Sequence, residues 1–175
     1  MIVSLIEARR VLALCAVAVA LAAPASAPAA DARTCGALDR NGLFADTKIT
    51  SARFVPEDPA KKLSAFCEVI GVISPAPDSK IGVVYRLPQN WNGKFLGLGG
   101  GGWAGDIKLE TAAPGLTRGY ATAQTDGGHP GTGTRDTSWA NDVTITDFAF
   151  RAVHQMTVVG KQVLHVRPQY LPYVD

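Results

Sequence analysis

Short apolar runs alternate with turn-forming residues along most of the chain, and each run predicts a β-strand. The two most apolar runs, FCEVIGVI at 66–73 and IGVVYRL at 81–87, are separated by Pro75, Pro77 and Asp78, which favours a hairpin. Three further strands are predicted where apolar residues alternate with polar ones or stand next to glycine. The predicted strands cover 48–55, 66–73, 81–87, 94–98 and 120–125.

One long helix is predicted towards the C-terminal end of the sequence. Thr146 or Asp147 can cap its first turn, and Pro168 stops it. Arg151 and His154 lie three residues apart on one face, and a solvated surface is favoured over a functional pair. The apolar residues that recur at helical spacing are Phe148, Val153, Met156, Val159, Val163 and Leu164.

The first thirty residues have the layout of a secretory signal peptide. Arg9 and Arg10 precede an apolar run at 11–23, and small residues follow as far as Ala30. The run is shorter than the roughly 20 residues that span a bilayer, which argues against a transmembrane anchor. We therefore expect residues 1–30 to be removed, leaving a secreted or periplasmic product (31–175) with no membrane attachment.

Composition excludes several classes of protein. Charged residues make up 18% of the chain and hydrophobic residues 47%, so the chain is neither disordered nor polybasic. The formal net charge of +2 is too small for a nucleic-acid-binding surface. The 18 glycines and 11 prolines indicate a fold rich in turns.

Export decides which cysteines can pair. Cys15 would leave with the signal peptide, so Cys35 and Cys67 would remain together in an oxidising compartment. A disulfide between them is favoured, because it would also tie down the new N-terminus. Two buried free thiols are the alternative.

The strongest candidate for chemistry is the glycine-rich segment GLGGGGWAG at 97–105, which follows a predicted strand. Backbone without Cβ atoms can turn sharply and bring its N–H groups against a ligand. A phosphate loop needs a lysine after its glycines and a helix start, and neither is present. The segment is therefore either an oxyanion hole, in which N–H groups hold a developing negative oxygen, or a flexible surface loop.

A second candidate is the polar turn TDGGH at 125–129. Asp126 and His129 could form a catalytic pair, half of a metal site, or a turn fixed by side-chain hydrogen bonds. One Asp and one His are too few ligands for a metal centre, and the composition favours the turn. We predict neither a metal site nor a cofactor.

Taken together, four segments resemble the tannase and feruloyl esterase family of secreted α/β-hydrolases. In chain order they are FCEVIGVISPAPDSKIGVVYRLP, WNGKFLGLGGGGWAGDI, GLTRGYATAQTDGGH and DFAFRAVHQMTVVGK. The resemblance runs from about Cys35 to Lys161. It implies an α/β-hydrolase fold and hydrolysis of phenolic esters, with feruloyl or galloyl esters as small-molecule substrates.

The resemblance also implies roles for individual residues. Trp103 would shape the substrate pocket. Asp126 and His129 match a TD-x-GH block that would support the wall of the active site rather than perform catalysis. The candidate oxyanion donors are Gly100, Gly101 and Gly102. Further matches to the family, on its long helix and among its N-terminal cysteines, are Arg151, His154, Cys35 and Cys67.

One motif of the family is missing from the 175 residues. These enzymes share a nucleophile motif, G-C-S-x-G-G, after the long helix, and neither it nor any G-x-S-x-G occurs here. The Asp and His of the triad follow the serine in such folds, so they are missing too. We therefore expect residues 31–175 to be the N-terminal part of a catalytic domain. That part lacks the nucleophile elbow, the lid and any calcium site of the family, and is inactive alone.

A different class of function stays open. A secreted β-rich module could bind carbohydrate or aromatic ligands without catalysis, with Trp91, Trp103 and Trp139 as stacking surfaces. Such a module should form a closed sandwich. An esterase fragment should instead leave an unpaired strand edge and an exposed apolar helix face.

Overall fold

The computed structural model describes residues 32–39, 42–131 and 133–166. The predicted signal peptide (1–30) and the predicted helix stop at Pro168 therefore lie outside the described residues. Within the described ranges, no helix is long and apolar enough to cross a membrane.

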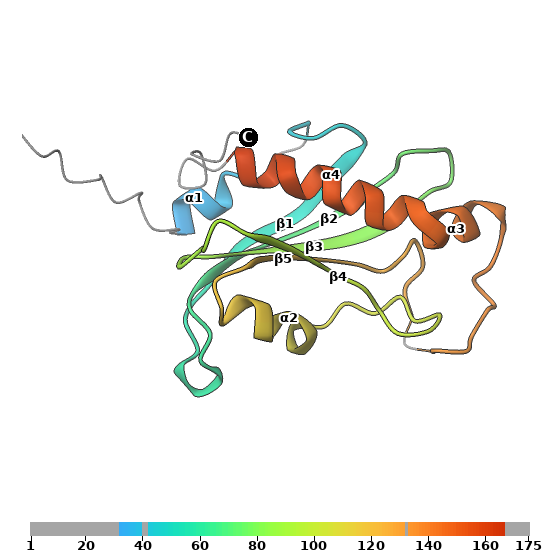
Figure 1. Ribbon diagram of the computed structural model, residues 1–175. Coiled ribbons are helices and arrows are strands. Elements are labelled where there is room, and N and C mark those ends of the chain that lie inside the picture. Colours follow the sequence, from blue (N-terminus) through green and yellow to red (C-terminus); the bar gives the residue numbers. More distant parts are fainter. Residues whose placement is uncertain (1–31, 40–41, 132, 167–175) are drawn as a thin grey trace, which may run out of the picture.

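The described residues form one mixed sheet with helices on both faces (Figure 1). Its strands are β1 (Thr47–Val55), β2 (Phe66–Ile73), β3 (Ile81–Pro88), β4 (Phe95–Leu98) and β5 (Ala121–Thr125). The helical segments are α1 (Ala32–Gly36), the 3₁₀ turn η1 (Pro59–Lys61), α2 (Leu109–Leu116), α3 (Asp142–Thr146), the π-helical turn η2 (Asp147–Arg151) and α4 (Ala152–His165).

The strands lie in the order β1-β2-β3-β5-β4, and only β4 and β5 run parallel. Each predicted strand is present with its ends within one residue of the prediction, and β2 and β3 form the predicted hairpin. The strand predictions succeed because apolar runs bounded by glycine and proline are a local signal.

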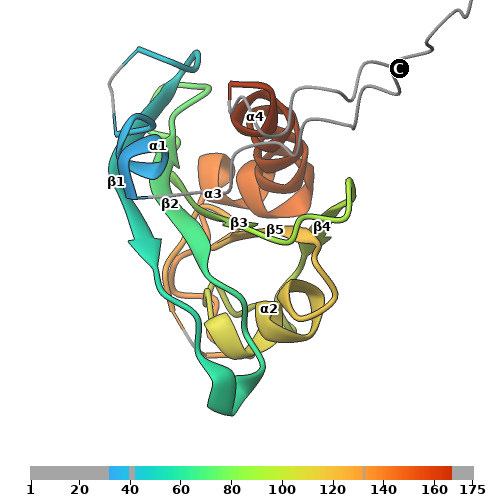
Figure 2. The same cartoon turned by 90° about the vertical axis from the view of Figure 1, so that its left-hand side faces the viewer.

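Alternation along the strands separates two cores. The larger core lies between the sheet and α4, where Val69, Ile73 and Tyr85 are fully buried. The smaller one, on the opposite face, joins Phe66 to Leu116 of α2. Figure 2 shows α4 and α2 on opposite sides of the sheet. This is the expected α/β architecture, and it differs from the sandwich expected of a β-rich binding module.

The long helix is anchored closely on the sheet. The hydroxyl of Tyr85 in β3 donates to the carbonyl oxygen of Met156 at 3.0 Å. A Cβ atom on Gly160 would stand 2.4 Å from the ring of Phe95 in β4, so glycine lets α4 approach the sheet. Burial raises the pKa of Tyr85 far above its usual value, which keeps the hydroxyl protonated.

The predicted start of this helix is wrong. Asn141 caps it, because its side chain accepts from the amides of Val143 and Thr144. Asp147, predicted as a cap, lies inside the helix and is fully buried. The π turn η2 adds a residue to one turn and shifts the apolar face, so Val153, predicted to be in the core, is about half exposed.

Two helices have no counterpart in the prediction. The segment Leu109–Leu116 contains Pro114 and Gly115, which favour turns when they are considered locally. It forms α2 because it packs on β4 and β5, where Ala112 and Leu116 are fully buried. The short helix α1 is held against the sheet by a covalent bond.

That bond is the predicted disulfide. Cys35 of α1 and Cys67 of β2 are joined, with their Cα atoms 5.5 Å apart and both residues fully buried. The pair confirms the disulfide and excludes the alternative of two free thiols.

We expect the double variant Cys35→Ala/Cys67→Ala to lose about 3–4 kcal/mol in the free energy of unfolding. The bridge joins residues 32 apart, and removing it restores the chain entropy of that loop to the unfolded state. Urea unfolding measures the change. Reductant should bring the wild type to the same value and leave the variant unchanged, and equal stability of variant and oxidised wild type would contradict the expectation.

Candidate active site at the glycine loop

The glycine loop (residues 99–105) and the polar turn (125–129) meet at the carboxyl ends of two neighbouring strands. The loop follows β4 and the turn ends β5, and these strands are parallel, so their carboxyl ends coincide. The connection from β4 to β5 carries α2 on one face, whereas the chain leaving β5 returns as α4 on the other (Figure 2). Open α/β sheets bind ligands where connections diverge in this way.

The end of the glycine loop lies directly against the polar turn. A Cβ atom on Gly105 would stand 1.7 Å from the carbonyl oxygen of His129. The amide of Gly105 donates to the carbonyl of Gly131 at 2.9 Å, and the amide of Trp103 donates to that of Thr134 at 3.1 Å. Because only glycine permits this approach, the two segments form one backbone unit.

Free N–H groups remain in the middle of the loop. Among the described residues, the amides of Gly100, Gly101 and Gly102 have no hydrogen-bond acceptor. Gly100 and Gly101 line a cavity of about 320 Å³, which we call the glycine cavity. Gly102 has a φ of 57° and packs on the backbone of Thr134 instead. Two of the three candidate oxyanion donors therefore border a space that can hold a ligand.

Polar side chains complete the glycine cavity. Lys108 and Asp106 form an ion pair there, and their hydrogen bond lowers the pKa of Asp106 and raises that of Lys108. Gln124 reaches the cavity from β5 and is almost fully buried. The remaining lining residues are Gly99, Ala104, Thr111 and Thr134.

Asp126 ties the polar turn to the neighbouring strand. Its Oδ1 atom accepts the amides of Gly82 in β3 and of Gly128, each at 2.8 Å. Burial raises the pKa of Asp126, the two amide hydrogen bonds oppose that rise, and the negative charge of Asp147 adds to it. The arrangement is a turn fixed by side-chain hydrogen bonds, which is the option that the composition favours.

A second buried carboxylate, Asp147 of η2, packs against the same turn. Its Oδ2 accepts from the hydroxyl of Ser79 at 2.8 Å, and its Oδ1 accepts from Nη1 of Arg151 at 2.7 Å. A Cβ on Gly128 would come within 2.7 Å of the Cβ of Asp147. Arg151 thus compensates a buried charge instead of lying on a solvated face, whereas His154 is exposed.

His129 is buried in an aromatic cluster. Its ring stacks on Trp139, with centroids 3.8 Å apart and planes at 4°, and Phe148 lies 5.4 Å away. Neither ring nitrogen has a hydrogen-bond partner among the described residues, and burial lowers the pKa of His129, so the neutral ring is favoured. Trp103 joins this cluster through Trp139 and Phe148, and is about half exposed.

The structure divides the predicted site residues into two groups. Gly100 and Gly101 border the glycine cavity, whereas Trp103, Asp126 and His129 do not line it and instead hold the surrounding loops. Substrate contact by these three residues stays a prediction. Sequence reasoning missed Gln124, whose only signal is a polar residue at an alternating position of a buried strand.

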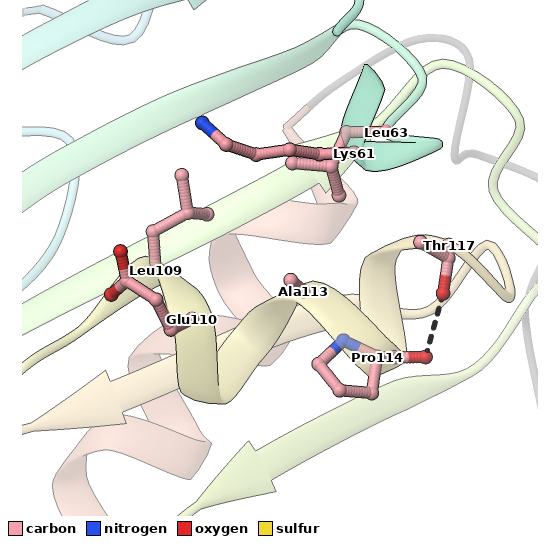
Figure 3. Close-up of a pocket in the computed structure, with 7 residues that line it drawn as sticks. All are labelled: Lys61, Leu63, Leu109, Glu110, Ala113, Pro114 and Thr117. Carbon is pink, nitrogen blue, oxygen red and sulfur yellow. Dashed lines mark hydrogen bonds between the residues drawn. The ribbon is translucent and has the colours of Figure 1, made fainter. Parts of the chain in front are cut away.

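A second cavity, of about 500 Å³, lies between α2 and the segment after η1 (Figure 3). Leu63, Leu109, Ala113 and Pro114 give it an apolar wall, with Lys61 and Glu110 at its sides. None of the predicted site residues lines it. Gly100 and Gly101 line the glycine cavity instead, so the glycine cavity is the better candidate for ester chemistry.

Comparison with known proteins places the chain in a family. The family model described as tannase and feruloyl esterase matches residues 67–170. The chain belongs to this family. Among its relatives, a probable feruloyl esterase B-2 of Aspergillus flavus is 39% identical over 97 residues, and feruloyl esterase C of Talaromyces stipitatus is 34% identical over 100 residues.

The tannase and feruloyl esterase relatives are much longer than the matched region. The matches cover 55% of this chain and 18% of the Aspergillus flavus relative, and 57% and 19% for the Talaromyces relative. The crystal structure of feruloyl esterase B from Aspergillus oryzae matches with a TM-score of 0.68 and 29% identity, over 79% of this chain and 30% of its own. The chain therefore spans about a fifth of these curated relatives and has part of the esterase fold.

The contact at Gly105 predicts that two alanine variants of this tannase-family chain differ in stability. Gly105→Ala must displace the backbone of the polar turn, so we expect a loss of about 1–3 kcal/mol or more in the free energy of unfolding. Gly101 has open space around its Cβ position, and Gly101→Ala should change that free energy by less than about 0.5 kcal/mol. Urea unfolding compares them, and equal stability of the two variants would contradict the contact.

Proposed function

We propose that this chain is part of a carboxylic ester hydrolase that acts on phenolic esters, with feruloyl or galloyl esters as substrates. The observation that carries the proposal is the pair of free amides at Gly100 and Gly101, which border a cavity at the carboxyl end of β4. The names of the relatives support the choice of a feruloyl ester, and the family description supports a galloyl ester.

The proposed chemistry is acyl transfer through a tetrahedral intermediate. Attack of a serine on the ester carbonyl puts negative charge on the carbonyl oxygen, and fixed N–H donors stabilise it. Each such donor increases the rate of the catalysed reaction by a factor of about 10²–10³. Gly100 and Gly101 would be these donors, held in place by the contact of Gly105 with the polar turn. The reaction needs no cofactor.

The topology supports a position for the serine. Within the described residues, the outer edge of β4 has no partner strand. Because α4 lies on the face opposite α2, a right-handed crossover after α4 would bring a further parallel strand to that free edge. A nucleophile at the end of such a strand would stand next to the glycine loop.

The free strand edge is accompanied by an exposed apolar helix face. The exposed large apolar residues on α3, η2 and α4 are Ile145, Phe150, Val153 and Val158. Both features are what an esterase fragment should leave. They support the proposal that further protein packs here in the active enzyme.

The 175 residues contain no nucleophile motif, so we further propose that they do not turn over these esters alone. The signal peptide predicted at 1–30 supports export, and the Cys35–Cys67 disulfide agrees with an oxidising compartment outside the cytosol.

A chimera tests the proposed function. Residues 35–166 replace the matching segment of feruloyl esterase B from Aspergillus oryzae, and release of ferulate from methyl ferulate is followed by absorbance. We expect the chimera to hydrolyse the ester, and the 175-residue chain to release no ferulate or gallate above the buffer rate.

Circular dichroism and thermal unfolding establish that the chimera is folded. A folded chimera without hydrolysis would refute the assignment of this segment to an ester hydrolase. Hydrolysis of methyl ferulate or methyl gallate by the 175-residue chain at enzyme-like rates would refute the second proposal.

A further inference from the structure

Gln124 is a polar residue on a buried strand. In β5 the side chains of Ala121 and Ala123 face the α4 core, so Thr122 and Gln124 face the side of α2. Gln124 is 3% exposed and is one of the residues that line the glycine cavity. A buried amide at a position that an apolar residue could fill needs a physical reason.

A chain of charged groups holds the Gln124 side chain. Nη1 of Arg86 in β3 donates to Oε1 of Gln124 at 2.6 Å, and Nε of Arg86 donates to Oε2 of Glu68 in β2 at 2.9 Å. The other oxygen of Glu68 accepts from Nη2 of Arg53 in β1 at 2.6 Å. Four residues on four strands are thus linked in a row that ends at the glycine cavity.

This row of contacts fixes which end of the amide faces the cavity. Arginine only donates hydrogen bonds, so the oxygen of Gln124 must face Arg86 and the amide nitrogen must face away. No described residue accepts from that nitrogen, and it is not among the enclosed side-chain atoms that lack a partner. The two N–H groups of Gln124 are therefore left to point into the glycine cavity.

Several hydrogen-bond donors line the glycine cavity. The free amides of Gly100 and Gly101 lie on its wall with Gln124, while the carboxylate of Asp106 is occupied by Lys108. Such a lining suits a ligand that presents a carbonyl or carboxylate oxygen. A volume of about 320 Å³ is at the lower end of the range for small-molecule sites, which fits one small aromatic acid.

We propose that Gln124 is a binding residue of the glycine cavity, which donates from its amide nitrogen to the carbonyl or carboxylate oxygen of a small aromatic acid or its ester. Arg86 and Glu68 are positioning residues that turn the amide. The choice of an aromatic acid rests on the proposed function. Burying an ion pair is seldom stabilising in itself, so a role in orienting Gln124 gives the Glu68–Arg86 pair its reason.

Binding of ferulate to the 175-residue chain tests this inference without any turnover. Titration calorimetry compares the wild type with Gln124→Glu, which still accepts from Arg86 but has no N–H to donate. We expect the Kd of ferulate to rise about tenfold or more, because a donor becomes a negative acceptor. Methyl ferulate is neutral and is not repelled by the new carboxylate, so its Kd for Gln124→Glu should rise only about threefold to tenfold.

Thr122→Val is the matched control. Thr122 lies on the same face of β5 and does not line the cavity, and its buried hydroxyl has no hydrogen-bond partner among the residues that the structure describes. Its variant should bind ferulate within about twofold of the wild type. Gln124→Met, which removes donor and acceptor together, should weaken ferulate binding to a similar degree as Gln124→Glu, and urea unfolding identifies any variant that is unfolded.

Two results would overturn the inference: no binding of ferulate by the wild-type chain, or wild-type affinity in folded Gln124→Glu and Gln124→Met. Because no ester is cleaved in these titrations, they are independent of the chimera assay. An inactive chimera together with Gln124-dependent ferulate binding would refute the proposed function and leave the binding role of Gln124 standing.

Discussion

The candidate site depends on one close approach of two backbone segments. Gly105 stands so near the carbonyl oxygen of His129 that any side chain would overlap it. This contact, with the hydrogen bond from Gly105 to Gly131, closes the glycine loop at its far end. The amides of Gly100 and Gly101 are therefore held by backbone packing, which leaves them free to face a ligand. An oxyanion hole needs donors that are already in place before charge develops.

The polar turn can support the glycine loop because two buried carboxylates fix the position of the turn itself. Asp126 binds it to β3 through Gly82, and Asp147 packs against Gly128 while Ser79 and Arg151 satisfy its oxygens. Isolated buried carboxylates would be costly, and these hydrogen bonds and the Arg151 charge offset that cost. The residues that match the family's TD-x-GH block therefore have a structural role, which is to fix the polar turn, and this role does not require contact with substrate.

Local patterns predicted most of the sheet, the disulfide and the glycine segment, because each rests on neighbouring residues or on a small count of cysteines. Features that depend on distant contacts were missed. The helix α2 forms in spite of Pro114 because Leu116 is buried against the sheet, and the π turn moved Val153 out of the predicted core. The pairing of Gln124 with Arg86 joins residues 38 apart, and no pattern in the sequence indicates it.

The most direct measurement is an NMR titration of the 175-residue chain, labelled with ¹⁵N, with ferulate. We predict that the resonances of the backbone amides of Gly100 and Gly101 and of the side-chain amide of Gln124 shift together, with one common Kd. Shifts gathered instead around Leu63, Leu109 and Ala113, which line the other cavity, with the glycine loop unchanged, would contradict it.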